Sequence, residues 1–169
     1  MLKIKQGLVV VLLASFASFA LAADKIAIVN VQRAIVDTDS AKRRLETLRK
    51  EPEFKANMKD IEAIKKEGQS LVDKLKKDGP VMSSDQQAAL QKKIQEKQAD
   101  LEHIGRKLQT REQEVLQEIM AQKQEKTKSV INDIIKSEKI GLLLDSRAAL
   151  HAEPGYDITA KVTSRLNAK

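Results

Sequence analysis

The chain has 169 residues, of which 31 are Lys or Arg and 24 are Asp or Glu, and it contains no cysteine. Without cysteine it can form neither disulfide bonds nor a lipid-modified N-terminal cysteine. Aromatic residues make up only 2% of the sequence, which is few for a conventional globular core, because aromatic side chains supply the largest buried areas. The composition instead favours long helices packed through Leu, Ile and Val.

Residues 1–22 have the pattern of a secretory signal peptide. Two lysines form a basic start, an apolar run begins at Leu8, and Ala20-Leu21-Ala22 matches a cleavage site of the A-x-A type. The apolar run is broken by Ala and Ser and is too short to span a membrane comfortably. We therefore expect cleavage after Ala22 and export of the mature chain, to a bacterial periplasm or out of the cell.

The mature chain opens with a β-rich apolar run, residues 25–31, which predicts a buried strand. Residues 33–37 lead out of this strand. Four potential N-cap residues follow at positions 37–40, and they predict the start of a helix near Ala41. Pro52 interrupts this helix, because proline lacks an amide hydrogen and restricts the residue before it. We expect a kink or a short break there.

Two amphipathic helices are predicted between residues 54 and 138. The first ends at Asp78-Gly79-Pro80, where glycine permits a left-handed cap and proline prevents continuation, and Ser83 to Asp85 offer N-caps for the second. Because the break is short, we expect an antiparallel hairpin with its tip near residues 78–83; a straight, interrupted parallel coiled coil is the alternative. Apolar residues follow a heptad pattern along both helices, at Phe54, Ile61, Ile64, Leu71 and Leu75 and at Leu90, Ile94, Leu101, Ile104, Leu108 and Val115.

The second helix, residues 84–138, contains no proline and would be about 80 Å long. No globular domain of this size could bury it, so it has to project and pair with the first helix. Three residues at core positions of the heptad pattern are not apolar: Gly68, Lys97 and Arg111. They either specify the register of the pairing or weaken it, so that the arm can bend and part.

The C-terminal part predicts two further strands and one helix. Residues 139–145 read as a strand, Ser146-Arg147 as a short turn and residues 148–152 as a third strand. After a loop at Pro154-Gly155, Asp157 is the expected N-cap of the last helix. One face of that helix carries Ile158, Val162 and Leu166, one turn apart.

The predicted fold is mainly α with a small β-rich body. Residues 23–37 and 139–169 form the body, and residues 38–138 form the helical hairpin arm. The body has 46 residues and three short strands, so it has little core of its own and exposes unpaired strand edges. We expect the chain to oligomerise through the body.

The positive charge of the arm is concentrated near its tip, where residues 65–97 hold eight lysines and five acidic residues. Such a patch can attract anionic lipid head groups or acidic polypeptides, more weakly at higher salt. A solvated helix surface without a dedicated partner explains the same residues equally well. The candidate residues, called the tip lysines below, are Lys74, Lys76, Lys77, Lys92 and Lys93.

The sequence contains no pattern of a catalytic or cofactor site. Neither His103 nor His151 has a His or Cys neighbour at the spacing of a metal site, and Asp145 ends a strand, where turn initiation is commoner than catalysis. There is no glycine-rich phosphate loop and no nucleophile motif. We therefore expect no enzymatic activity and no cofactor. Export, mixed charge and the scarcity of aromatic residues for base stacking argue against a nucleic-acid partner.

Three segments resemble the Skp/OmpH family of periplasmic chaperones: residues 25–33 (KIAIVNVQR), 142–145 (LLLD) and 156–159 (YDIT). The signal peptide and the long charged hairpin are similar as well. The resemblance implies a homotrimer that works without ATP, in which three arms surround a cavity holding unfolded outer-membrane proteins. The helices at 54–77 and 84–125 would line this cavity.

The resemblance also implies how the subunits associate. The strands of three subunits would form a central β-body, supported by the last helix. A structural or adaptor coiled coil of the cell envelope, which would bind one folded partner through a defined face, is the alternative function. The residues implied in the trimer body are Ile26, Ile28, Val29, Leu142, Leu143, Leu144, Val162 and Leu166.

Overall fold

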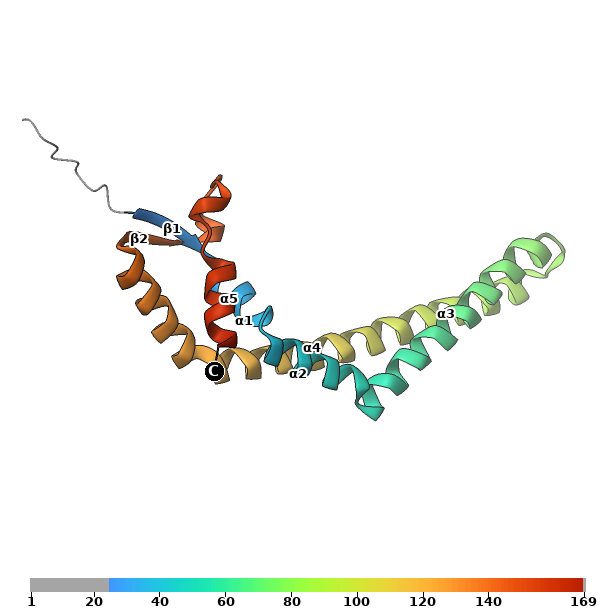
Figure 1. Cartoon of the computed structure of the whole chain (residues 1–169). Helices are drawn as coiled ribbons and strands as arrows, with labels where there is room; N and C mark the ends of the chain where they lie inside the picture. The colour runs from blue at the N-terminus through green and yellow to red at the C-terminus, as the bar shows by residue number, and fades with distance from the viewer. Residues whose placement is uncertain (1–24, 169) are drawn as a thin grey trace, which may run out of the picture.

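The computed structural model describes residues 25–168, so the predicted signal peptide and its cleavage site lie outside the described residues. The described chain is elongated, with a small sheet at one end and the tip of a helical hairpin at the other (Figure 1). None of the described helices combines the length and the apolar character needed to cross a membrane. The elements are β1 (Lys25–Val29), α1 (Val31–Val36), α2 (Asp39–Lys50), α3 (Pro52–Asp78), η1 (Gly79–Val81), α4 (Ser84–Glu138), β2 (Ile140–Asp145), η2 (Ser146–Ala148), η3 (Pro154–Tyr156) and α5 (Thr159–Asn167).

The arm is an antiparallel pair of helices, α3 and α4, which confirms the predicted hairpin (Figure 1). The apolar heptad residues of both helices are buried or half-buried between them, Leu90 most fully within the distal part. A capping box starts α4: the Gln86 amide donates to the Ser83 side chain (3.3 Å), and the Ser83 amide donates to the Gln86 side chain (3.0 Å). The serine-rich stretch before α4 therefore caps the helix as predicted.

The tip differs from the prediction in the conformation of Gly79. This residue ends α3 with right-handed backbone angles (φ −50°, ψ −44°), not with a left-handed cap. The chain continues as the 3-10 turn η1, in which Pro80 needs no amide hydrogen bond. The Gln87 side chain donates a hydrogen bond to the Gly79 carbonyl (2.8 Å), so the end of α3 is satisfied from α4 instead.

Pro52 produces a complete break between α2 and α3. Glu51 adopts extended backbone angles (φ −57°, ψ 136°), and Pro52 is the first residue of α3, a position where proline is well tolerated. Both α2 and α3 lie against α4. We call this break at Glu51-Pro52 the elbow of the arm.

The strands β1 and β2 form a two-stranded parallel sheet, in which Ile26 lies opposite Leu142 and Ile28 opposite Leu144. The predicted third strand at residues 148–152 does not form in the single chain, so this part of the prediction is wrong. Two extended strands of five and six residues are marginal on their own and depend on what packs against them.

The local hydrogen bonds after β2 explain why the chain turns away from the sheet. The Asp145 carboxylate accepts hydrogen bonds from the Arg147 amide (2.9 Å) and from its guanidinium (2.8 Å), which closes the turn η2. The segment returns to β1 only at Asp157, through a bridge to Ile28 and a hydrogen bond from the Ile158 amide to the Ile28 carbonyl (3.0 Å).

The hydrophobic core lies where the sheet, α1 and α5 pack on the C-terminal part of α4 (Figure 1). The short helix α1 was not predicted; the Asn30 side chain starts it by accepting a hydrogen bond from the Arg33 amide (2.8 Å). The core also takes residues from α2 and α4, so it is larger than the 46 residues of the predicted body would supply. Its buried members include Ala27, Val29, Ile35, Leu48, Val115, Ile119, Ile134, Val162 and Leu166.

The last helix, α5, buries the face that the sequence predicted, with Ile158, Val162 and Leu166 all in the core. Asp157 lies one residue before its N-cap position, and its carboxylate accepts a hydrogen bond from the Thr159 amide (2.8 Å). Thr159 in turn accepts a hydrogen bond from the Asn30 amide (2.9 Å). These bonds tie the start of α5 to the start of α1.

Candidate functional site

The sheet presents an apolar face that the single chain leaves open. Side chains alternate along a strand, so Ala27 and Val29 of β1 point into the core while Ile26 and Ile28 point away from it. On β2, Leu142 is 47% exposed, and Leu144 is exposed as well. We call this surface, formed by Ile26, Ile28, Leu142 and Leu144, the outer sheet face.

The predicted body residues thus divide into two groups. Four of them form the outer sheet face, whereas Val29, Val162 and Leu166 are buried inside the chain and Leu143 is partly buried against the same core. The sequence could not separate the groups, because both read as apolar positions in strands and helices. Only the first group is available to a second molecule.

An ionic clamp fixes the geometry beneath the sheet. Glu138, at the end of α4, pairs with Lys25 of β1 and Lys161 of α5. Hydrogen bonds from Lys161 and then from Lys25 lower the pKa of the Glu138 carboxyl below its usual value. The next residue, Lys139, adopts left-handed angles (φ 53°, ψ 48°) and turns the chain from α4 into β2. The sequence does not indicate this clamp, because Lys25, Glu138 and Lys161 lie far apart in the chain.

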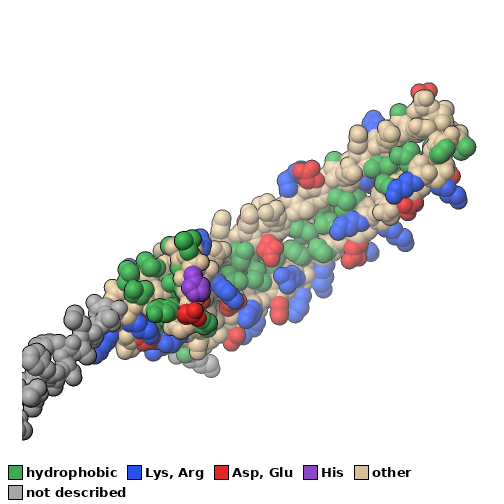
Figure 2. Space-filling model, turned by 90° about the horizontal axis from the view of Figure 1, so that it is seen from above, with side chains coloured by type: hydrophobic (Ala, Val, Ile, Leu, Met, Phe, Trp, Pro, Cys, Tyr) green, Lys and Arg blue, Asp and Glu red, His purple; other side chains and the backbone are tan. Residues whose placement is uncertain are grey.

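The side chains between the two helices of the arm are half-buried, and those on its outer surface are mostly charged. Figure 2 shows apolar side chains following the line between the two helices, flanked by Lys, Arg, Asp and Glu. Lys97 of α4 forms an ion pair with Glu67 of α3 (2.6 Å), and its stem lies beside Gly68. A Cβ at position 68 would lie 3.8 Å from the Cβ of Lys97, an ordinary contact distance, so the Lys97–Glu67 pair does not require glycine at this position.

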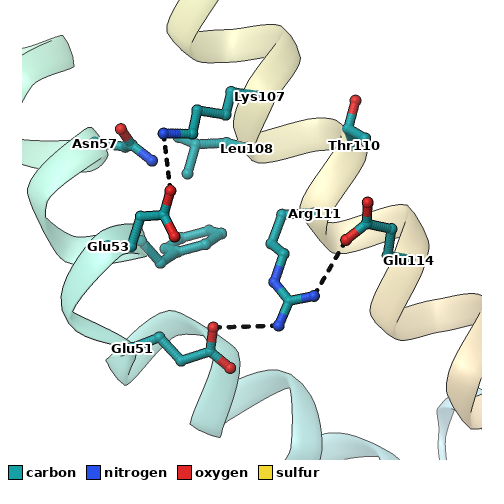
Figure 3. A pocket seen from close by; sticks show the side chains of 9 residues that line it. Glu51, Glu53, Asn57, Lys107, Leu108, Thr110, Arg111 and Glu114 are labelled. Carbon is teal, nitrogen blue, oxygen red and sulfur yellow. Dashed lines mark hydrogen bonds and ion pairs between the residues drawn. The ribbon is translucent and has the colours of Figure 1, made fainter.

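The elbow holds a pocket between α3 and α4, which Phe54 lines together with several charged side chains (Figure 3). Lys107 pairs with Glu53 (2.8 Å), and its hydrogen bond lowers the pKa of Glu53. Arg111 binds Glu114 (3.1 Å) and reaches Glu51 (3.5 Å), and these carboxylates raise its pKa.

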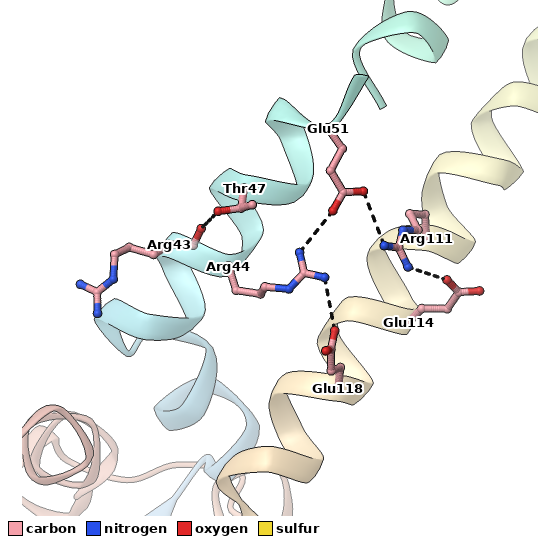
Figure 4. Close-up of polar contacts among 7 residues, drawn as sticks. All are labelled: Arg43, Arg44, Thr47, Glu51, Arg111, Glu114 and Glu118. Atoms are coloured by element: carbon pink, nitrogen blue, oxygen red, sulfur yellow. Dashed lines mark hydrogen bonds and ion pairs between the residues drawn. The ribbon is translucent and has the colours of Figure 1, made fainter. Parts of the chain in front are cut away.

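Glu51 connects all three helices at the elbow (Figure 4). Its two oxygens lie near Arg44 of α2 (3.4 Å) and Arg111 of α4 (3.5 Å), while Arg44 also pairs with Glu118 of α4 (3.3 Å). These ion pairs are long and partly exposed, so each contributes little, and together they form a network of weak interactions at the elbow. Arg111 at its heptad position therefore joins the helices instead of separating them.

The tip lysines all lie exposed on the distal third of the arm. None of the five forms an ion pair with another residue of the described chain, which leaves their charges available to a partner.

The histidines and acidic residues considered from the sequence lie apart from one another in the described chain. Residues 25–168 contain no group of three or more His, Cys, Asp or Glu side chains that could hold a metal ion. His103 is exposed on α4, as predicted, and His151 is exposed beside Glu153. Hydrogen bonding to Arg147 lowers the pKa of Asp145 to about 2. The role of this carboxylate is to stabilise the turn η2.

Comparison with known proteins gives a consistent match across the chain. The family model described as outer membrane protein (OmpH-like) matches residues 25–166. The chaperone protein Skp of Photorhabdus luminescens is 31% identical over 90% of this chain and 91% of its own. That of Yersinia enterocolitica is 30% identical over 91% and 93%, and the Skp-like protein of Pseudomonas aeruginosa is 24% identical over 88% and 87%.

A crystal structure described as an OmpH-like outer membrane chaperone of Caulobacter crescentus CB15 covers 86% of this chain and 85% of its own, with 21% identity and a TM-score of 0.46. The family match and the curated relatives named chaperone protein Skp agree with the resemblance in the first strand and the last helix. The chain therefore belongs to the OmpH-like family, the family of the Skp chaperones.

Proposed function

We propose that this protein is a holdase of the bacterial periplasm, an ATP-independent chaperone that binds unfolded outer-membrane β-barrel proteins and prevents their aggregation. The observation that carries the proposal is the outer sheet face, which is open in the described chain and lies at the opposite end from the tip of the arm, whose distal part is covered by no other described segment. The face would join several copies, and the arms would project from the assembly. The relatives named chaperone protein Skp support this assignment.

Assembly follows from the outer sheet face. Burial of apolar surface contributes roughly 25 cal/mol per Å², and a two-stranded sheet gains stability when its open face is covered. A homotrimer would bring three such faces together around one axis. In this arrangement residues 23–37 and 139–169 form the trimer body, Ile26, Ile28, Leu142 and Leu144 make the contacts, and Val29, Leu143, Val162 and Leu166 hold the strands from within.

Three arms, residues 38–138 of each copy, would enclose a cavity between the helices at 54–77 and 84–125. An unfolded client has to be held and later released, which requires many weak contacts instead of one tight pocket. Several arms around one cavity raise the effective concentration of client segments and give avidity. The half-buried apolar line of the arm offers such contacts along its length. Release would then need no nucleotide, and we infer no cofactor.

Residues 1–22 would direct the chain to the periplasm, with cleavage after Ala22. At the arm ends, the unpaired tip lysines would attract acidic segments of a client or anionic lipid head groups. Electrostatic attraction of this kind accelerates encounter more than it strengthens the final complex. Replacing all five tip lysines by Gln should slow client association and flatten its salt dependence, without altering the oligomer.

The test is dilution of a urea-denatured outer-membrane barrel protein into buffer with the mature chain and without nucleotide. Light scattering should show that the client stays soluble. A client that aggregates as fast as in buffer alone would overturn the holdase proposal and leave the structural or adaptor role as the explanation of the arm.

A shortened arm is the matched control. Residues 58–71 and 94–107 lie opposite each other in the register defined by the contact of Gly68 with Lys97. Their removal takes two heptads from each helix and shortens the arm by about 21 Å. The tip, the ion pairs of Glu51 with Arg44 and Arg111, and the core residues of α2 and α4 all remain, whereas Lys107 is removed. This variant should assemble like the wild type and protect the client less well. Equal protection would show that the arm does not hold the client.

A further inference from the structure

A groove lies between α1 and α4, on the body end of the molecule, and no described segment fills it. Its floor is mainly apolar, and Gln124 and Asn132 add amide groups along α4. Thr127 lies in the groove with 3% of its surface exposed, and its hydroxyl has no hydrogen-bond partner among the described residues. Buried hydroxyls are normally hydrogen-bonded to protein or to water, so the Thr127 hydroxyl can take a hydrogen-bond partner from another molecule. The lining includes Val31, Ile35, Met120, Thr127, Lys128 and Ile131.

The same end of the molecule carries an exposed loop, residues 149–153, that projects an apolar side chain into solvent. Between η2 and η3, Leu150 is fully exposed, the most exposed large apolar side chain of the described residues. The loop is anchored at both ends, by Asp145 with Arg147 and by the bridge from Asp157 to β1. Figure 2 shows apolar side chains gathered over this end. Leu150 is therefore fully available for contact with another molecule.

The loop also has unused backbone groups. Ala149 and Glu153 have extended backbone angles, and the amides of residues 150–153 donate no backbone hydrogen bond within the described chain. An extended segment with free amides and carbonyls can satisfy hydroxyl and amide side chains such as those in the groove. Glu153, exposed at the end of the segment, is opposite in charge to Lys128 at the groove.

We propose that the loop at residues 149–153 of one copy inserts into the groove between α1 and α4 of the next copy. Leu150 occupies the apolar floor, the loop backbone bonds to Thr127, and Glu153 pairs with Lys128. The contact joins two different surfaces, so repetition around an axis closes a ring in which every groove and every loop is used. This inference rests on the proposed homotrimer and adds a second contact to the outer sheet face.

The absence of cysteine allows a direct test, because single cysteines can report only contacts between chains. Leu150→Cys and Ala121→Cys, the latter in the groove, are made in chains of different mass, unfolded together in urea, refolded and oxidised. A disulfide forms only where Cα atoms approach within about 7 Å. The expected product is a mixed disulfide dimer of one Leu150→Cys chain with one Ala121→Cys chain, whereas Val81→Cys at the arm tip with Ala121→Cys should give none.

Two results would overturn the inference. A cross-link of Leu150→Cys to Leu142→Cys in place of the groove would assign the loop to the sheet of the neighbour. A wild-type trimer by sedimentation, combined with no mixed dimer, would refute the loop contact while leaving the proposed function intact; a wild-type monomer would refute both.

A second measurement does not depend on cysteine. Leu150→Asp places a carboxylate on the groove floor and should weaken the assembly, raising its dissociation constant more than tenfold. The matched change Val81→Asp, at a strongly exposed apolar residue of the tip, should leave it unchanged. Equal behaviour of the two variants would contradict the contact.

Discussion

Gly68 lies in the middle of α3, and its replacement by Ala tests whether the arm has a soft point. Glycine in a helix interior costs about 0.8–1 kcal/mol relative to Ala. The backbone at Gly68 has ordinary helical angles, and an added Cβ would lie 3.8 Å from the Cβ of Lys97, which is normal contact distance. Gly68→Ala should therefore stabilise the arm by about 1 kcal/mol, with a small extra gain from the new contact across the helix pair.

Gly105 provides the matched control, because a Cβ there meets no heavy atom within 4 Å. Gly105→Ala should give the propensity gain alone. Hydrogen exchange followed by mass spectrometry measures both effects, since local opening governs exchange in the arm. A gain of about 1 kcal/mol slows exchange about fivefold near the substituted residue. Faster exchange around residue 68 after Gly68→Ala would refute the reasoning, because it would mean that the pairing of Lys97 with Glu67 depends on the glycine.

Three further changes test the body. Lys139→Gly should stabilise the chain by about 1 kcal/mol in urea unfolding, because Lys139 alone among described non-glycine residues has a positive φ; a loss of stability would show that its side chain matters more. Glu138→Gln should lower the free energy of unfolding by about 1 kcal/mol near neutral pH. Because the folded state lowers the pKa of Glu138, its carboxylate stabilises the fold above a pH of about 4.5, and this stabilisation is lost as the pH falls through the folded-state pKa. The variant and the wild type should therefore become equally stable in acid, and a difference that stays constant with pH would contradict the clamp. Leu142→Asp should dissociate the proposed oligomer in analytical ultracentrifugation without unfolding the chain, and an unchanged sedimentation coefficient would exclude the outer sheet face as the interface.

The sequence by itself determined the elements whose causes are local. Heptad spacing predicted the α3–α4 hairpin, Pro52 predicted the break before α3, and the stretch Ser83 to Asp85 predicted the start of α4. Periodicity, proline sterics and capping all act within a few residues. The buried face of α5 followed from residues one turn apart. The short helix α1 was missed, since its six residues follow an apolar run that reads as one strand and depend on Asn30 for their cap.

The tertiary structure decided everything that depends on distant residues. Which apolar strand residues face outward, as Leu142 does, depends on the register of β1 against β2, and these strands are separated by the whole arm. Residues 148–152 carry the pattern of a strand, yet the Asp145–Arg147 turn directs them away from the only sheet of the described chain. The clamp at Glu138 and the network at Glu51 join charges that are ordinary surface residues in the sequence. Their roles arise only where the folded chain brings the helices and strands together.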